Sequence, residues 1–437
     1  MNTKSLAAFL ASLLILACPA AYCADWQQLD DEGLKDLKDG SYQAAEKSLK
    51  AALEEAEKFG ESDPRLALSL TDLASLYKAQ GKYAEAEPLL LRSVNVVERA
   101  KGPDNPEIAI NLNNLGLLYQ VEGKYPEAKA SYYRALMVSE KVTGPNHPVV
   151  ATSLNHLAEL YRVQGKFDDA EPCYMRAIEI NEKVRGPNDP VLALNLNNLG
   201  LLYFNEGKLA KAEPLYKRAL GINEKVLSPS DPNLISNLSN LADLYRILGR
   251  YTDAQPLYEK VLASEEKTLG SDHVDVAKAL NNLAETYRGE KKYAEAEPLF
   301  KKAIAIYEKN SQGDSTECAK ALSNLGLLNK DQKKYDEAET LLHKAMQIDE
   351  EKRGGAHAAV AVDLTYLAGI YECQQRYAEA ELAYNQAYNI ERSSLGMIHA
   401  NVAWTLENYA ALLRKTNKNK KADELEKMAK AIRARLE

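Results

Sequence analysis

The sequence repeats itself every 42 residues from Leu73 onward, and this repeat constrains the fold more than any other feature. Each copy holds, with substitutions, a Leu followed by a small residue and a Tyr, then Gly-Lys-Tyr, then Ala-Glu-Pro-Leu. The recurring Leu position is occupied by Leu73, Leu115, Leu157, Leu199, Leu241, Leu283, Leu325, Leu367 and Tyr409. A fixed period over most of a chain indicates stacked units that pack only on their neighbours. The repeat therefore predicts one elongated array in place of several globular domains.

The unit from Asn105 to Gly144 shows how one repeat is built. Asn105 and Pro106 are a helix cap and a first-turn residue, and apolar residues follow at helical spacing. Gly123 interrupts this helix, and a second helix follows that Gly144 ends. Each repeat is therefore predicted to be a pair of antiparallel helices. Gly116 and Ala128 are small where we expect the two helices to cross closely.

The pattern Leu-Gly/Ala-x-x-Tyr, with a small residue in the second helix, resembles the tetratricopeptide repeat (TPR). The 42-residue period, the Asn-Asn-Leu-Ala/Gly run and the Gly-Pro-x-x-Pro loop are similar to the kinesin light chain variety, over about residues 26–437. The resemblance implies an all-α, right-handed superhelical solenoid of about ten helix-turn-helix repeats, with the first helices lining the concave side. The coiled-coil segment by which kinesin light chains join their motor is absent from this sequence, which argues against a motor-transport role.

The N-terminus has the layout of a secretory signal peptide. Lys4 precedes an apolar run from Leu6 to Ala17, and small residues continue to Ala24. The run is too short to span a membrane comfortably, so the sequence predicts an exported bacterial protein, periplasmic or secreted. We divide the chain into a signal peptide (1–24), a short TPR-like hairpin (25–62), the tandem array (63–414) and a C-terminal capping helix (415–437).

Two modes of processing remain open for this leader. Ile15-Leu16-Ala17-Cys18 resembles a bacterial lipobox, in which Cys18 becomes lipidated and anchors the protein to a membrane. The alternative is ordinary cleavage near Ala21 or Cys23, which releases a soluble protein.

Composition excludes several classes of function. The net charge of −8, with both signs mixed along the chain, lacks the basic stripe of a nucleic-acid binder. No catalytic motif, phosphate-binding loop or metal-ligand spacing is present, so we expect neither an enzyme nor a cofactor. Cys173, Cys318 and Cys373 are too far apart in such an array for disulfides, and we expect them to be buried as small apolar residues.

Polar residues recur at two positions just before the repeated Leu. Asn is a poor residue in a helix interior, so its recurrence there requires a reason. The resemblance places both positions in the concave groove, where an amide can donate to and accept from a peptide backbone. The alternative is that these side chains join neighbouring repeats. The predicted peptide-binding residues are Asn113, Asn114, Asn155, His156, Asn197, Asn198, Asn240, Asn281, Asn282 and Asn324.

Cations recur later in the same helices, and Arg162, Arg246 and Arg288 join the predicted binding set. Acidic residues precede them at helical spacing, so a self-paired surface is the alternative. Cations that do bind a ligand would favour acidic side chains or a C-terminal carboxylate.

Histidines occupy the helix-cap position of several repeats and therefore do not indicate a metal site. His147, His273, His357 and His399 stand where other repeats have Asp63, Asn105, Asp189 and Asp231.

Together these features predict a non-catalytic scaffold that binds an extended peptide or protein segment in its concave groove. An envelope assembly factor or lipoprotein acting through the convex face or the edges is the alternative. An accessory domain of an enzyme is weaker, because the repeats occupy the whole predicted mature chain. The sequence predicts neither the partner's identity nor the oligomeric state.

Overall fold

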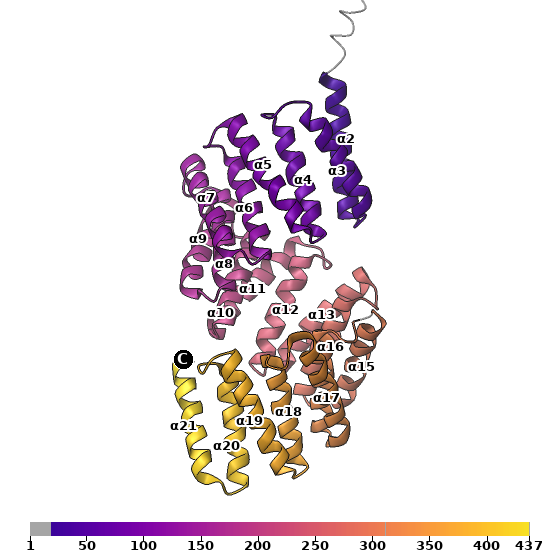
Figure 1. Cartoon of the computed structure of the whole chain (residues 1–437), viewed down its shortest axis with the longest axis vertical. Helices are drawn as coiled ribbons and strands as arrows, with labels where there is room; N and C mark the ends of the chain where they lie inside the picture. Colours follow the sequence, from indigo (N-terminus) through magenta and orange to yellow (C-terminus); the bar gives the residue numbers. More distant parts are fainter. Residues whose placement is uncertain (1–18, 311, 437) are drawn as a thin grey trace, which may run out of the picture. The chain divides into compact units, whose positions relative to one another are not determined.

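The computed structural model describes residues 19–310 and 312–436, and this part of the chain forms twenty α-helices and no strand (Figure 1). The helices form two compact units, one ending at Val226 and the other beginning at Leu227. The helices of unit 1 are α2 (Pro19–Lys38), α3 (Tyr42–Glu57), α4 (Pro64–Ala79), α5 (Tyr83–Lys101), α6 (Pro106–Val121), α7 (Tyr125–Thr143), α8 (Pro148–Val163), α9 (Phe167–Arg185), α10 (Pro190–Asn205) and α11 (Leu209–Val226). The helices of unit 2 are α12 (Pro232–Ile247), α13 (Tyr251–Leu269), α14 (Val274–Gly289), α15 (Tyr293–Lys309), α16 (Thr316–Asp331), α17 (Tyr335–Arg353), α18 (Ala358–Cys373), α19 (Tyr377–Ser394), α20 (Ala400–Lys415) and α21 (Asn419–Leu436).

Consecutive helices pair into hairpins, α2 with α3 and so on to α20 with α21, and each hairpin packs on the next within its unit. The even-numbered helices are called first helices below, and the odd-numbered ones second helices. The prediction of an all-α solenoid of about ten helical hairpins is confirmed.

The first helices begin at the predicted caps. The Oδ1 atom of Asp63 accepts from the backbone N–H two residues later at 2.9 Å, and that of Asn105 does the same. His147, His273 and His357 use Nδ1 as the acceptor, at 3.1–3.3 Å. His399 caps α20 in the same way at 3.1 Å. The capping role predicted for these histidines is therefore confirmed.

The Gly-Lys-Tyr motif closes each hairpin and ties it to the previous repeat. Gly123 has φ +74°, which lets the Lys124 N–H donate to the Tyr119 carbonyl at 2.8 Å. This bond satisfies a backbone carbonyl in the last turn of α6. The Lys124 ammonium lies over the Tyr119 ring and 2.9 Å from Glu87 of the preceding repeat. The Tyr119 hydroxyl also donates to Glu87, at 3.1 Å. The recurring Tyr, Lys and Glu of the motifs thus form a clamp between repeats.

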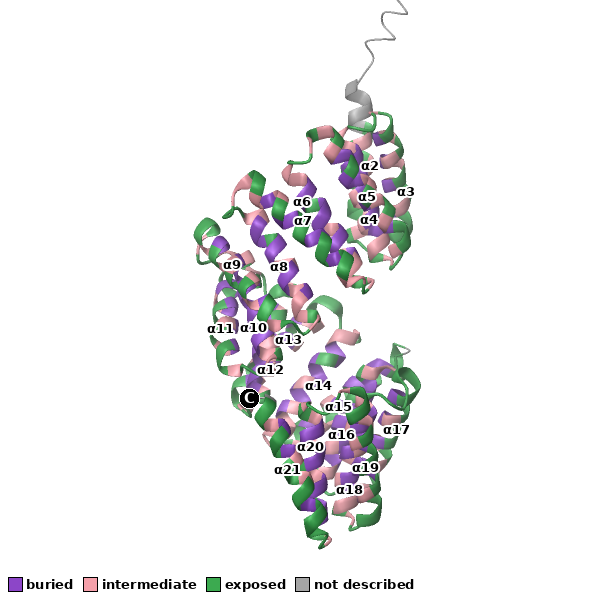
Figure 2. Ribbon diagram, turned by 60° about the vertical axis from the view of Figure 1, so that its left-hand side comes forward, coloured by how far each residue is buried: buried purple, intermediate pink, exposed green. Residues whose placement is uncertain are grey.

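The core lies between the helices of each hairpin and between neighbouring hairpins (Figure 2). All nine residues at the repeated Leu position are buried. The helices cross closely at Gly116, where an added Cβ would lie 2.5 Å from the Tyr132 ring. The predicted close crossing is confirmed there, and Ala128 is fully buried nearby in α7.

Cys173, Cys318 and Cys373 are unpaired, but only part of the prediction for them holds. Cys318 is buried and Cys173 is half-buried. Cys373 is exposed and is the last residue of α18. The prediction that it is buried was wrong.

Residues 1–18, including Cys18, lie outside the described residues, so the signal peptide and the lipid anchor stay predictions. None of the described helices is long and apolar enough to cross a membrane. Within the described ranges, no three His, Cys, Asp or Glu side chains are grouped so that they could hold a metal ion.

Candidate binding groove on the first helices

The first helices lie on the inner side of each unit. In unit 1, α2 contacts α4, α6 contacts α8, and α8 contacts α10. In unit 2, α14, α16, α18 and α20 contact one another in succession. Among the described residues, successive second helices have no contact of comparable extent. The exposed face of the first helices is therefore the inner face of the array within each unit.

The Asn position two residues before the repeated Leu is used mainly between repeats. Asn113 is buried and donates to Ser153 at 3.1 Å. Asn155 accepts from Asn195 at 2.9 Å and from Asn198 at 3.2 Å. Asn197 and Asn281 are also buried. These bonds correspond to the alternative of joining neighbouring repeats, and they leave little of the four side chains for a ligand.

The position directly before the Leu is more accessible. Asn114, Asn198, Asn240 and Asn282 are half-buried, with one side toward the inner face. Asn324 is buried and donates to Asn281 of the preceding repeat at 3.2 Å. Nothing in the structure tests whether these amides bind a peptide, but the four half-buried ones are those that a ligand can reach.

His156 replaces Asn at this position, and its ring stacks on Tyr132 with centroids 5.4 Å apart. Burial, reinforced by the positive charge of Lys78, lowers the pKa of His156 to about 4, although Glu159 acts in the opposite direction. The imidazole is therefore neutral at neutral pH and contributes no positive charge to the inner face.

The three predicted arginines are paired with acids of the array itself. Arg162 forms a two-pronged ion pair with Glu159 of its own helix. Arg246 lies 3.2 Å from Asp243 and 2.6 Å from Glu285 of the next repeat. Arg288 lies 3.8 Å from Asp331. The geometry corresponds to the self-paired alternative, so a ligand carboxylate would have to compete with these partners.

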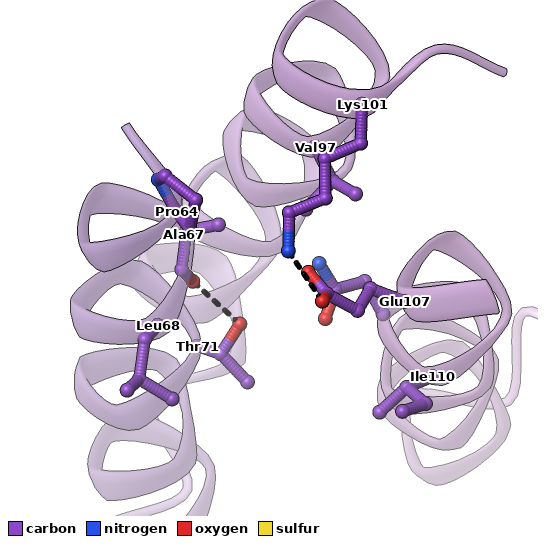
Figure 3. A pocket seen from close by; sticks show the side chains of 9 residues that line it. Pro64, Ala67, Leu68, Thr71, Val97, Lys101, Glu107 and Ile110 are labelled. Carbon is purple, nitrogen blue, oxygen red and sulfur yellow. Dashed lines mark hydrogen bonds and ion pairs between the residues drawn. The ribbon is translucent and has the colours of Figure 1, made fainter. Parts of the chain in front are cut away.

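A pocket of about 340 Å³ opens on the inner face between α4 and α6 (Figure 3). Leu68 and Ile110 line it from the two helices and are 47% and 51% exposed. Lys101 of α5 and Glu107 of α6 form an ion pair at its edge. Thr71 donates to the carbonyl of Ala67, so this polar group is already satisfied. The pocket is thus apolar, with charges that neutralise each other.

The family model named Tetratricopeptide repeat matches residues 36–99, 66–136, 107–183, 150–225, 233–309 and 317–393. The chain belongs to the tetratricopeptide repeat family. Such arrays are interaction scaffolds, generally without catalytic activity, and they bind peptides or proteins. No curated protein matches the chain.

Several solved structures are similar to this chain. The apo quorum sensor NprR from B. thuringiensis is 16% identical, with a TM-score of 0.59 over 84% of this chain and 99% of that chain. BtubC (BKLC) from P. vanneervenii is 25% identical, with a TM-score of 0.48 over 52% of this chain and 92% of that one. A putative kinesin light chain from P. anserina is 25% identical, with a TM-score of 0.43 over 47% and 98%. The likeness to NprR shows the fold alone.

Sequence reasoning did not identify the pocket of this TPR array. The buried side of α4 carries Leu66, Leu70 and Leu73, and Leu68 falls outside that stripe. Ile110 stands one repeat later at the same position. A large apolar residue that recurs off the buried stripe was the available signal.

Proposed function

We propose that this TPR array is a non-catalytic scaffold that holds an extended segment of a partner protein along the inner face of its first helices. The observation that carries the proposal is the apolar pocket between α4 and α6, which lies on the same face as the half-buried amides. A pocket of this size and polarity fits an apolar side chain rather than a charged one.

The amides and the apolar pocket would recognise different parts of the bound segment. An amide such as that of Asn114 can donate to and accept from a peptide backbone whatever its sequence. Leu68 and Ile110 would cover an aliphatic or aromatic side chain of the segment. Because Lys101 and Glu107 already neutralise each other, the pocket favours an uncharged side chain. We therefore infer a ligand segment with a large apolar residue at this point.

The chain offers two matched double variants for the test. Leu68→Lys with Ile110→Lys places charge in the pocket. Tyr133→Lys with Met175→Lys places the same charge on second helices, at residues that are 54% and 53% exposed. Because exposure is similar in both pairs, differences in folding are minimised.

A random peptide library is selected on the full chain, and the enriched peptides are measured against both variants. We expect enriched peptides to contain a large apolar residue and to bind the pocket variant roughly tenfold to a hundredfold more weakly, the value of one buried aliphatic side chain. The second-helix variant should bind as the parent does. Equal binding to parent and pocket variant would contradict the proposal.

One observation favours a second candidate, docking through the outer face of unit 1. Leu91, Tyr133 and Met175 occupy the same repeat position on α5, α7 and α9, and all three are exposed. Large apolar residues that recur on an exposed face are typical of protein interaction surfaces. Loss of binding in the second-helix variant, with the pocket variant unaffected, would favour this alternative.

A further inference from the structure

One inter-repeat junction of unit 2 contains two buried carboxyl groups where unit 1 has amides. Ser323, Asp349 and Asp363 lie on α16, α17 and α18. Four repeats earlier in the sequence, the equivalent positions of α8, α9 and α10 are occupied by asparagine. The same backbone arrangement therefore holds two different kinds of polar contact.

The unit 1 junction is a chain of hydrogen bonds between amides, and the Asn181 Oδ1 at its end has no partner among the described residues. The Asn181 Nδ2 donates to Asn195 Oδ1 at 2.6 Å, and the Asn195 Nδ2 donates to Asn155 Oδ1 at 2.9 Å. Asn181 and Asn195 are both buried. Because amides do not ionise, these bonds are independent of pH over the range in which proteins are stable.

The unit 2 junction joins the equivalent positions, but one carboxyl oxygen of each aspartate has no hydrogen-bond partner among the described residues. The Ser323 hydroxyl donates to Asp363 Oδ1 at 2.7 Å, which reverses the donor and acceptor of the equivalent bond in unit 1, where Asn195 donates to Asn155. Asp363 is only 4% exposed, and its Oδ2 has no hydrogen-bond partner among the described residues. Asp349 is also buried, and Arg353 Nε lies 3.2 Å from its Oδ1. Asp349 thus has a cation beside it, whereas Asp363 has none.

We propose that Asp363 is a proton-controlled latch between neighbouring repeats of unit 2, closed when its carboxyl group is protonated and weakened when it ionises. A protonated carboxyl group is neutral and nearly the shape of the amide that fills this position in unit 1. The ionised form places a charge in a buried site with no compensating cation, which is costly.

The charges around the latch come from three elements. Asp349 and Arg353 face the junction from α17, Glu317 from α16, and His357 from the start of α18. Arg353 and His357 act on Asp349, while Asp363 itself experiences the negative charge of Asp349. Burial first, and then Asp349, raise the pKa of Asp363 to about 7, although the Ser323 hydrogen bond acts in the opposite direction.

The direction of the pH effect follows from proton binding. When the junction opens, Asp363 returns to an ordinary carboxyl pKa near 3.9 and loses its proton at neutral pH. The closed state binds the extra proton, so its stability is full below about pH 4 and falls as pH rises toward about 7. One proton changes the opening equilibrium at most about tenfold per pH unit.

The latch would also act on the inner face. Ser323 precedes Asn324, whose amide bonds Asn281 of the preceding repeat at 3.2 Å. Release of a bound segment at higher pH is a consequence that rests on the proposed function, whereas the latch itself does not.

The test is hydrogen exchange measured by mass spectrometry on the full chain without ligand, from pH 5 to 8 and corrected for intrinsic exchange. In the parent, we expect the opening constant of α18 amides to rise with pH, by up to about tenfold per unit between pH 5 and 7. Asp363→Asn should reduce this slope. Asn195→Asp, the reciprocal change, should create a slope of the same sign in α10.

An unchanged slope in Asp363→Asn, or no slope in the parent, would overturn the proposal. Should the single variant fail to fold, the double variant Ser323→Asn with Asp363→Asn recreates the amide pair of unit 1 and gives the same readout. Because no ligand is present, failure of the latch is distinguishable from failure of the proposed binding function.

Discussion

At the position where α4 and α6 carry Leu68 and Ile110, α14 and α16 of unit 2 carry Lys278 and Lys320. All four side chains are exposed, and the helices that carry them have the same length and caps of the same kind. These two repeats of unit 1 therefore present apolar side chains where α14 and α16 present cations, while α18 and α20 of unit 2 carry Val362 and Trp404 at the same position. The difference shows that one repeat can carry different recognition chemistry, because a few exposed positions change while the buried ones are retained.

The hairpin turns and helix crossings differ between the units as well. At Gly165 of unit 1 the turn has φ +70°, and four repeats later Lys333 has the same conformation, with φ +64°. The helix crossing at Gly116 is closed by Tyr132, whereas at Gly326 the nearest side chain is Leu342, 3.1 Å from an added Cβ. The crossing at Gly116 is thus tighter than that at Gly326, and the turns at Lys291, Lys333, Gln375 and Asn417 of unit 2 carry backbone strain that the glycine turns of unit 1 and the Gly249 turn of unit 2 do not.

The largest effect is expected from filling the tight crossing. Gly116→Ala would place a methyl group 2.5 Å from the Tyr132 ring, and we expect it to lower the free energy of unfolding by about 2–3 kcal/mol. Gly326→Ala should cost less, about 1 kcal/mol, because the Leu342 side chain can move and Ala favours a helix, although the Ala338 carbonyl oxygen lies 3.3 Å from the added Cβ. Urea denaturation of both variants, followed by circular dichroism, measures the difference.

The next repeat supplies a rescue for the first variant. Ala158 coexists there with Tyr174, whose hydroxyl donates to Glu159 at 2.8 Å. Leu117 stands at the position of Glu159, so Gly116→Ala with Leu117→Glu should recover part of the loss when the Tyr132 hydroxyl exchanges its 3.0 Å bond to Gln120 for the new carboxylate. Equal losses in Gly116→Ala and Gly326→Ala would remove the contrast between the crossings.

A smaller effect is expected from His156, with a pH dependence opposite in sign to that of Asp363. Its pKa is about 4 in the folded chain and near 6.5 when unfolded, so its contribution is complete above pH 6.5 and declines as pH falls toward 4. At pH 5 the parent should have lost about 1–2 kcal/mol relative to His156→Asn. Asn is chosen because the neighbouring repeats carry it at this position, as Asn114 and Asn198.

The measurement compares the unfolding free energies of parent and variant at pH 7.5 and pH 5. The parent-minus-variant difference at each pH is used, because it cancels the contribution of Asp30 and Asp72 of unit 1. Their effect on stability changes with pH in the direction opposite to that of His156. Burial raises their pKa values to about 6 and about 7. A parent-minus-variant difference that does not change with pH would show that His156 is not buried in its neutral form.

The helices, their caps and the core were predictable from the sequence because their signals are local and repeat every 42 residues. Asp63 and His147 mark helix starts by their position before the apolar stripe, and the repeated Leu marks the core. The partners of polar side chains were not predictable. Whether Asn113 meets a ligand or Ser153 depends on side-chain geometry across two repeats, which the spacing of one repeat does not contain.

The same limit applies to the inner face. The acids near Arg246 were visible in the sequence, but its bond to Glu285 of the next repeat depends on how closely α12 and α14 approach. The pocket beside Leu68 likewise depends on the space between α4 and α6. Local pattern therefore predicts each repeat, and the packing between repeats determines which of its polar and apolar groups remain available.

The smallest expected effect concerns the hairpin turns, at Gly165 and Lys333, which occupy the same repeat position four repeats apart. Lys333→Gly should raise the stability of unit 2 by about 0.5–1 kcal/mol, because Gly adopts positive φ without the strain that a side chain incurs, less its greater freedom in the unfolded chain. Gly165→Lys should lower the stability of unit 1 by a similar amount, since no atom lies within 4 Å of its added Cβ and only backbone strain changes. Hydrogen exchange in α16–α17 and α8–α9 reports each change in its own unit. Stability changes of equal size and opposite sign in the two variants would show that these two turns differ only in backbone strain. A loss of stability in both variants would indicate that Lys333 makes a stabilising contact of its own.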